Sequence, residues 1–215
     1  MHEVDVFWSF RSPYSYIVTP RLMALAKRSN TNVTFRPVMP LLLRAPARFN
    51  GATPDAISYF ARDMLREAER HGLPFQWPNP DPLDVHGLLE LDSESDQERI
   101  YRLTRLGILA AEAGKGIEFA LEVGKLTFGG VENWYDGDHL AKAAEQAGLD
   151  LAGLDETIRA EQNRLDEAIA ANEAAQTKAG HWGVPLMVYR GEPFFGQDRF
   201  DSLLWRIIET ETAAT

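Results

Sequence analysis

The chain of 215 residues contains no cysteine. This absence excludes a structural disulfide, a zinc site with thiolate ligands and a redox centre of the Cys-X-X-Cys kind. A thiol can therefore take part in the chemistry of this chain only if a bound ligand supplies it. The five histidines show none of the spacings typical of metal ligands, so we expect no metal site.

Basic clusters and long apolar runs are also missing. The formal net charge is −10, and no run of Lys and Arg indicates a nucleic-acid or anionic-membrane partner. No apolar run approaches the roughly 20 residues of a membrane-spanning helix, and no signal peptide is recognisable. We therefore expect a cytoplasmic protein without a membrane partner. A chain with 45% hydrophobic residues is long enough to bury a sizeable core.

The N-terminal segment has the pattern of a strand, a helix and a second strand. Branched and aromatic residues from Glu3 to Phe10 predict a buried strand. Ser12 is a favourable N-cap and Pro13 suits the first helical position, which predicts a helix to about Lys27. The alternation from Asn32 to Arg36 predicts the second strand.

The C-terminal segment has the pattern of two strands and a helix. The apolar run from Leu186 to Tyr189 predicts one strand, and Pro193 to Phe195 predicts a short edge strand. We expect Asp198 to cap a final helix from Arg199 to about Glu209.

Between these two halves the pattern is helical. A helix is predicted to begin at Thr53-Pro54 and to end near Gly72. Further helices are predicted over residues 96–113, 117–126, 138–147 and 154–178. The whole predicts an α/β thioredoxin-like fold (βαβ…ββα) interrupted by a helical insertion domain. Residues 1–39 and 180–215 would form the thioredoxin-like domain, and residues 40–179 the insertion, including the long connecting helix.

Three short motifs are candidates for a binding or catalytic site. The Ser12 hydroxyl would lie at the positive end of a helix dipole, a position that favours an anion such as a thiolate, although serine at such a position more often serves only as a cap. Pro185 in Gly183-Val184-Pro185 could form a cis peptide bond that turns the Val184 backbone toward a cleft, or an ordinary trans bond. Asp198 and nearby amides could hold an ammonium and a carboxylate, or Asp198 could only cap its helix.

The order of these motifs carries a resemblance to a known family. The segments VDVFWSFRSPYSYIVTPRL and GVPLMVYRGEPFFGQDRFDSLLWRI resemble the 2-hydroxychromene-2-carboxylate isomerases and the related kappa-class glutathione transferases, within the DsbA-like thioredoxin superfamily. GATPDAISYFARDMLREAERHGLPF resembles the first insertion helix of that family. The chain departs from the family in lacking the common lysine early in this helix, in Arg11, and in the His181-Trp182 pair.

The resemblance implies glutathione as cofactor and a role for each motif. Ser12 would replace the cysteine of redox relatives and would hydrogen-bond the glutathione sulfur. Val184 and cis Pro185 would bind the peptide backbone of glutathione. Gln197 and Asp198 would hold the γ-glutamyl group. Asn50 would be a further cofactor-binding residue.

The resemblance also implies a reaction and a second substrate. We expect a glutathione-dependent isomerase that acts on an aromatic-pathway intermediate, with Tyr14, His181 and Trp182 near a small aromatic substrate. A kappa-type transferase or peroxidase, and a non-catalytic thioredoxin-like binding protein, are the alternatives. A homodimer is expected from the same resemblance.

Overall fold

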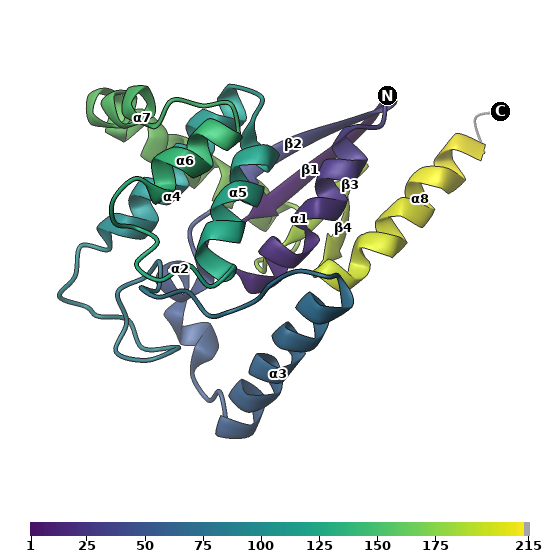
Figure 1. The fold of residues 1–215 in the computed structure, drawn as a ribbon. Coiled ribbons are helices and arrows are strands. Elements are labelled where there is room, and N and C mark those ends of the chain that lie inside the picture. The colour runs from purple at the N-terminus through teal and green to yellow at the C-terminus, as the bar shows by residue number, and fades with distance from the viewer. Residues whose placement is uncertain (213–215) are drawn as a thin grey trace.

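The computed structural model describes residues 1–212 and contains a four-stranded mixed sheet (Figure 1). The strands are β1 (His2–Trp8), β2 (Thr31–Pro37), β3 (Leu186–Tyr189) and β4 (Glu192–Phe195), in the spatial order β2-β1-β3-β4. β1 is parallel to β2, whereas β3 pairs antiparallel with both β1 and β4. This topology confirms the predicted βαβ…ββα arrangement.

Helices connect the two halves of the sheet and cover it. They are α1 (Pro13–Ala26), α2 (Leu41–Arg44), the 3₁₀ helix η1 (Pro46–Phe49), α3 (Pro54–Arg70), α4 (Glu98–Glu112), α5 (Gly116–Phe128), α6 (His139–Gln146), α7 (Leu151–Lys178), the 3₁₀ helix η2 (Gln197–Arg199) and α8 (Phe200–Thr212). Every predicted helix is present, with ends that differ by a few residues. The short α2 and η1 were not predicted, because four-residue helices have no periodicity to detect.

Both faces of the sheet carry buried apolar side chains, and every residue of β3 is buried. Val4, Val6 and Trp8 belong to the main core, together with side chains of α1 and α8. Phe7 points to the opposite face and packs with residues of β3 and with the end of α7. Because side chains alternate along β1, this strand contributes to two separate apolar clusters, one on each face of the sheet.

Close packing fixes the insertion helices against the thioredoxin-like part. α5 lies against α1, and a Cβ atom built at Gly124 would lie 2.6 Å from Cδ2 of Tyr16. A side chain at position 124 would push these helices apart, since real Cβ atoms almost never come so close.

The long helix α7 is kinked. Glu161 has φ and ψ of −126° and 25°, which are not helical, and separates two straighter parts. The helix predicted over residues 154–178 is therefore present, but its kink was not predicted.

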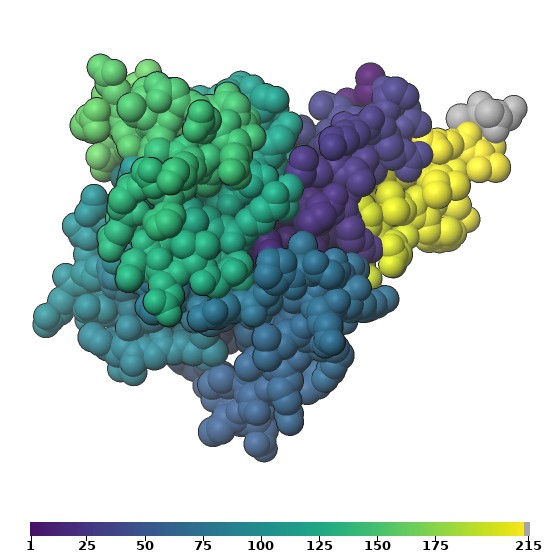
Figure 2. Space-filling view, in the orientation of Figure 1, coloured from purple at the N-terminus to yellow at the C-terminus, as the bar shows by residue number. Residues whose placement is uncertain are grey.

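α3 and α8 are the outlying helices of the molecule. Figure 2 shows both projecting from the main body, α3 at the bottom and α8 at the right. In residues 1–212, we find no helix with the length and apolar character needed to cross a membrane.

Candidate active site

Ser12 lies between the end of β1 and the first turn of α1. Its backbone is extended, and its Oγ accepts a hydrogen bond of 3.2 Å from the Ser15 N–H. Pro13 occupies the first helical position, where an N–H would have no helical acceptor. Ser12 therefore caps α1 as predicted, and its hydroxyl lies at the positive end of the helix dipole.

The Val184–Pro185 peptide bond lies opposite Ser12 and is cis, which confirms that expectation. The Oγ of Ser12 is 3.5 Å from the carbonyl oxygen of Val184, at the outer limit for a hydrogen bond. In residues 1–212 the Val184 N–H donates no hydrogen bond to another protein group. The Ser12 hydroxyl therefore lies beside the Val184 carbonyl, just before the start of β3.

The segment before the cis bond is held in place at Gly183. The Gln176 side chain of α7 donates a 2.8 Å hydrogen bond to the Gly183 carbonyl. The Gly183 N–H donates a 2.9 Å hydrogen bond to Nδ1 of His181. A Cβ atom at position 183 would lie 2.3 Å from Cε2 of Phe195, so only glycine fits without a shift.

His181 supports this segment through its ring as well. The ring stacks on Phe195 with centroids 3.9 Å apart and on Trp182 at 5.0 Å. Burial, and then the positive charge of Arg48, lower the pKa of His181 below its usual value. The neutral ring accepts the Gly183 N–H at Nδ1, which leaves its proton on Nε2.

A cavity of about 240 Å³ opens beside Ser12 and Val184, and we call it the Ser12 pocket. Segments far apart in the chain form its wall, and most of the side chains are aliphatic or aromatic. The lining residues are Ser9, Arg11, Ser12, Pro13, Tyr14, Pro40, Leu41, Leu42, Phe49, Phe60, Trp77, Leu88, Leu89, Trp182, Gly183, Val184 and Phe195. Of the three predicted substrate residues, Tyr14 and Trp182 line this pocket, and His181 is not among its lining residues.

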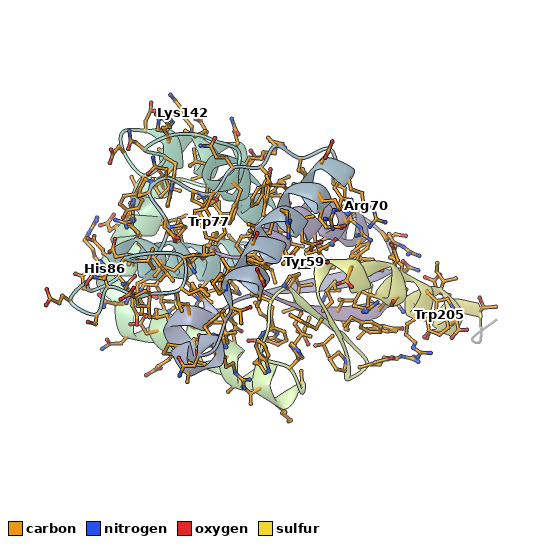
Figure 3. All side chains as sticks on the ribbon, turned by 90° about the horizontal axis from the view of Figure 1, so that it is seen from below. Tyr59, Arg70, Trp77, His86, Lys142 and Trp205 are labelled. Atoms are coloured by element: carbon orange, nitrogen blue, oxygen red, sulfur yellow. The ribbon has the colours of Figure 1, made fainter. Side chains whose placement is uncertain are left out.

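Arg11 is a site residue whose function the sequence did not reveal. Its guanidinium makes a bidentate ion pair with Asp81, at 2.7 and 2.8 Å, and donates to the Leu88 carbonyl at 2.8 Å. Trp77 donates to the same Asp81 carboxylate at 3.1 Å. Figure 3 shows Trp77 within the body of the molecule. A charged residue directly after a buried strand was the available signal, but it could not identify a partner 70 residues away.

Tyr14 faces the pocket from the first turn of α1. Its hydroxyl donates a 2.6 Å hydrogen bond to Asp63 of α3, and its ring meets Phe60 edge-on, with centroids 5.4 Å apart. Burial raises the pKa of Tyr14 well above its usual value, and the hydrogen bond to Asp63 raises it further. Tyr14 therefore remains protonated and ties α1 to α3.

Gln197 and Asp198 lie in η2, beyond β4. The buried Gln197 side chain donates a 2.6 Å hydrogen bond to Glu67 of α3, whereas its Oε1 is buried without a partner in residues 1–212. Asp198 is exposed and makes no capping hydrogen bond. The predicted cap was wrong, because a 3₁₀ turn precedes α8 and shifts the start of that helix to Phe200.

Asn50 lies outside the Ser12 pocket. It follows η1 in an exposed loop, and its backbone N–H donates to the Ala47 carbonyl at 3.2 Å. Its neighbour Phe49 contributes to the pocket wall instead. The structure therefore does not bring Asn50 together with Ser12 and Val184.

Three larger hollows of about 660, 580 and 330 Å³ lie elsewhere, against α4 and α7. The first is lined by ion pairs such as Arg102–Asp155, and none of the three includes Ser12 or Val184. We therefore assign the chemistry to the smaller Ser12 pocket. In the described part of the chain, no three His, Asp or Glu side chains form a group that could hold a metal ion.

Comparison with known proteins agrees with this fold. A 2-hydroxychromene-2-carboxylate isomerase from Sphingobium xenophagum is 24% identical over 204 residues, covering 93% of this chain and 95% of that protein. The structure of a 2-hydroxychromene-2-carboxylate isomerase matches with a TM-score of 0.71 at 19% identity, over 99% of both chains. The cytosolic disulfide reductase DsbM from Pseudomonas aeruginosa matches with a TM-score of 0.62 at 16% identity, over 99% of this chain and 100% of that one.

The fold and the site define a thioredoxin-like protein whose first helix, α1, is capped by Ser12. The match to the DSBA-like thioredoxin domain extends over residues 3–207. The chain therefore belongs to the DSBA-like thioredoxin domain family, with a helical insertion between the strands of a mixed four-stranded sheet.

Proposed function

We propose that this protein is a glutathione-dependent isomerase of the 2-hydroxychromene-2-carboxylate isomerase type. It would act on an aromatic-pathway intermediate through a glutathione thiolate stabilised by Ser12. One observation carries the proposal: the Ser12 hydroxyl lies at the N-terminus of α1, 3.5 Å from the Val184 carbonyl oxygen, at the wall of an apolar pocket. The similar isomerases and their names support it.

The chemistry of Ser12 supports thiolate binding rather than covalent catalysis. The chain has no cysteine, so a thiolate in this pocket would belong to a ligand. A hydroxyl hydrogen bond to a charged acceptor stabilises it by about 1.5–3 kcal/mol, which raises the ratio of thiolate to thiol roughly tenfold to a hundredfold. A serine nucleophile would need a general base within hydrogen-bond reach. In residues 1–212 the Ser12 hydroxyl bonds only backbone groups, those of Ser15 and Val184.

Backbone groups near the cis bond support recognition of a peptide-like ligand. The Val184 N–H has no acceptor within residues 1–212, and the Val184 carbonyl is only weakly engaged by Ser12. Both could pair with the cysteinyl backbone of glutathione. Gln197 Oε1 is buried without a partner and could accept a hydrogen bond from the γ-glutamyl ammonium. Asp198 would add a negative charge near that ammonium.

When bound, glutathione would supply a thiolate for reversible addition to a conjugated double bond, which would allow the substrate to isomerise and would return the thiol without net oxidation. Ser12 would donate a hydrogen bond to this thiolate, and the Val184 backbone would hold the peptide part of glutathione in place.

The decisive experiment measures glutathione binding and thiol ionisation together. Calorimetry should show saturable binding of glutathione, and ultraviolet titration should show a thiol pKa in the complex below that of free glutathione. Turnover that is catalytic in glutathione would distinguish an isomerase from a kappa-type transferase, which consumes it. A protein that binds no glutathione would contradict the proposal. By the same resemblance we propose a homodimer, which light scattering tests.

A further inference from the structure

We propose that the Ser12 pocket takes an uncharged, single-ring aromatic electrophile with a conjugated double bond, and that it disfavours a carboxylated one. This inference rests on the glutathione-dependent function proposed above and specifies only its second substrate. It differs from what the names of the similar isomerases suggest, because those names specify a carboxylate.

The charges of the pocket wall carry the inference. Arg11 is the only Lys, Arg, Asp or Glu among the described residues that line the pocket. Its side chain is 8% exposed and its partner Asp81 11% exposed, and the two are joined by two short hydrogen bonds. A third hydrogen bond commits the same guanidinium to the Leu88 carbonyl. The pair is neutral overall, so the wall offers no uncompensated positive charge to a carboxylate.

An apolar wall penalises a charged ligand. A carboxylate that leaves water for such surroundings loses its hydration, and only a well-placed opposite charge compensates for that loss. Asp81 already neutralises the charge of the Arg11 guanidinium and accepts hydrogen bonds from its Nε and Nη2. A second carboxylate would have to displace Asp81 or lie beside it, and like charges at that distance repel one another.

The size and lining of the pocket favour one aromatic ring. Its volume of about 240 Å³ lies below the roughly 300–1,000 Å³ of pockets for drug-sized ligands. Indole and phenyl rings from Trp77, Trp182 and Phe60 contribute to its wall, and aromatic side chains favour offset or edge-on contacts with a bound ring. Leu88 and Leu89 add aliphatic surface. A flat ring with a short conjugated side chain fits this wall, with its double bond directed at Ser12.

Two further cations lie near the pocket, beside the exposed Trp182 at its mouth. Arg44 donates a 3.2 Å hydrogen bond to the Trp182 carbonyl, and its charge is compensated by Glu173 at 3.7 Å. The Arg48 guanidinium lies over the Trp182 ring, 4.4 Å from its centroid, and Arg48 is exposed. An exposed charge is hydrated and screened by salt, so it attracts anions weakly. We therefore expect Arg48 to contribute little to the choice between neutral and charged substrates.

The test compares two electrophiles that differ by one charge, cis-benzylideneacetone and its para-carboxy analogue. For both, thiolate addition, bond rotation and elimination convert the cis to the trans enone, with glutathione returned. Calorimetry in the presence of the non-reactive S-methyl glutathione gives the affinity for each enone. We expect the neutral enone to bind roughly tenfold more tightly or better. Equal or tighter binding of the carboxylated enone would overturn the inference, as would absence of binding of the neutral enone.

Three substitutions test whether the Arg11–Asp81 pair causes this preference. Asp81→Asn leaves the Arg11 charge uncompensated, so the affinity ratio should move toward the carboxylated enone. Asp166→Asn removes the bidentate partner of Arg105 outside the pocket and should leave the ratio unchanged. If Arg48→Gln changes the ratio as much as Asp81→Asn does, the mouth rather than the wall selects the substrate and the inference is wrong.

Failure of the proposed function and failure of this inference give different results. Failure to bind glutathione contradicts that function, whereas the enone affinities measured without glutathione still decide the preference of the pocket. Should Asp81→Asn not fold, as judged by circular dichroism, the wild-type affinities alone decide.

Discussion

The Oγ of Ser12 lies 3.5 Å from the carbonyl oxygen of Val184, although 172 residues separate the two in the chain. The antiparallel pairing of β1 with β3 produces this meeting, because Ser12 follows the end of β1 and Val184 precedes β3. A helix N-terminus and a backbone with an unpaired N–H are thereby brought to one pocket.

Replacing Ser12 by alanine should lower catalysis more than stability. Loss of an N-cap costs about 1 kcal/mol, so Ser12→Ala should keep the fold. The thiol pKa of bound glutathione should rise and kcat should fall, because an oriented donor to the developing charge is lost. Ultraviolet titration of the complex and steady-state kinetics measure both effects.

Thr53→Ala is the matched control for that experiment. Thr53 caps α3 by accepting a hydrogen bond of 3.2 Å from the Ala56 N–H, and it is not among the residues that line the Ser12 pocket. It should lose a similar amount of stability without a change in thiol pKa. If both variants leave pKa and turnover unchanged, Ser12 is only a helix cap, and His181 is the next candidate.

Gly183→Ala should disturb the cis-proline segment. The added methyl would meet Phe195 at 2.3 Å, so Phe195 or the segment must move. Overpacking of this kind costs about 1–3 kcal/mol. We expect a lower melting temperature and weaker glutathione binding. Gly87→Ala serves as control, since nothing lies within 4 Å of the added atom. Identical behaviour of the two variants would show that Phe195 yields easily.

Protonation of His181 should destabilise the site at acidic pH. The pKa of His181 is lowered in the folded protein, so between that pKa and about 6.5 the unfolded chain binds more protons. The His181 contribution to stability is therefore complete above about pH 6.5 and is lost as pH falls through the lowered folded pKa. The imidazolium cannot accept the Gly183 N–H at Nδ1, and the neighbouring Arg48 repels it.

His181→Phe keeps an aromatic ring but does not titrate. Its melting temperature should fall less between roughly pH 7 and pH 5 than that of the wild type, since the other acidic groups are common to both. Parallel melting curves for the two proteins over this range would mean that His181 is not protonated there.

The Arg11–Asp81 pair should be costly to break. Removal of one partner leaves the other buried without a counter-charge, so we expect Arg11→Met to lower the free energy of unfolding by about 3–5 kcal/mol. Arg206→Met removes an exposed bidentate pair with Glu192 and should cause a much smaller loss. Urea denaturation compares the two. A loss for Arg11→Met as small as that for Arg206→Met would show that water reaches Asp81 readily.

Local signals in the sequence were sufficient to predict most of the strands and helices. Branched and aromatic residues identify β1, and the Ser12-Pro13 cap begins α1 where it was predicted. These features depend on neighbouring residues, whose side chains meet within one strand or one turn. The same reasoning misjudged Asp198, because a 3₁₀ turn and a cap look alike in sequence.

The partners of the site depend on contacts between distant segments. Arg11 pairs with Asp81 across 70 residues, and Gln197 with Glu67 across 130. A charge or an amide in a sequence does not reveal which distant group will neutralise it, because that choice depends on how the elements pack. The sequence alone therefore supplied the serine, the proline and the order of the strands. Only packing of the insertion against the sheet determined the shape of the Ser12 pocket and its lack of net charge.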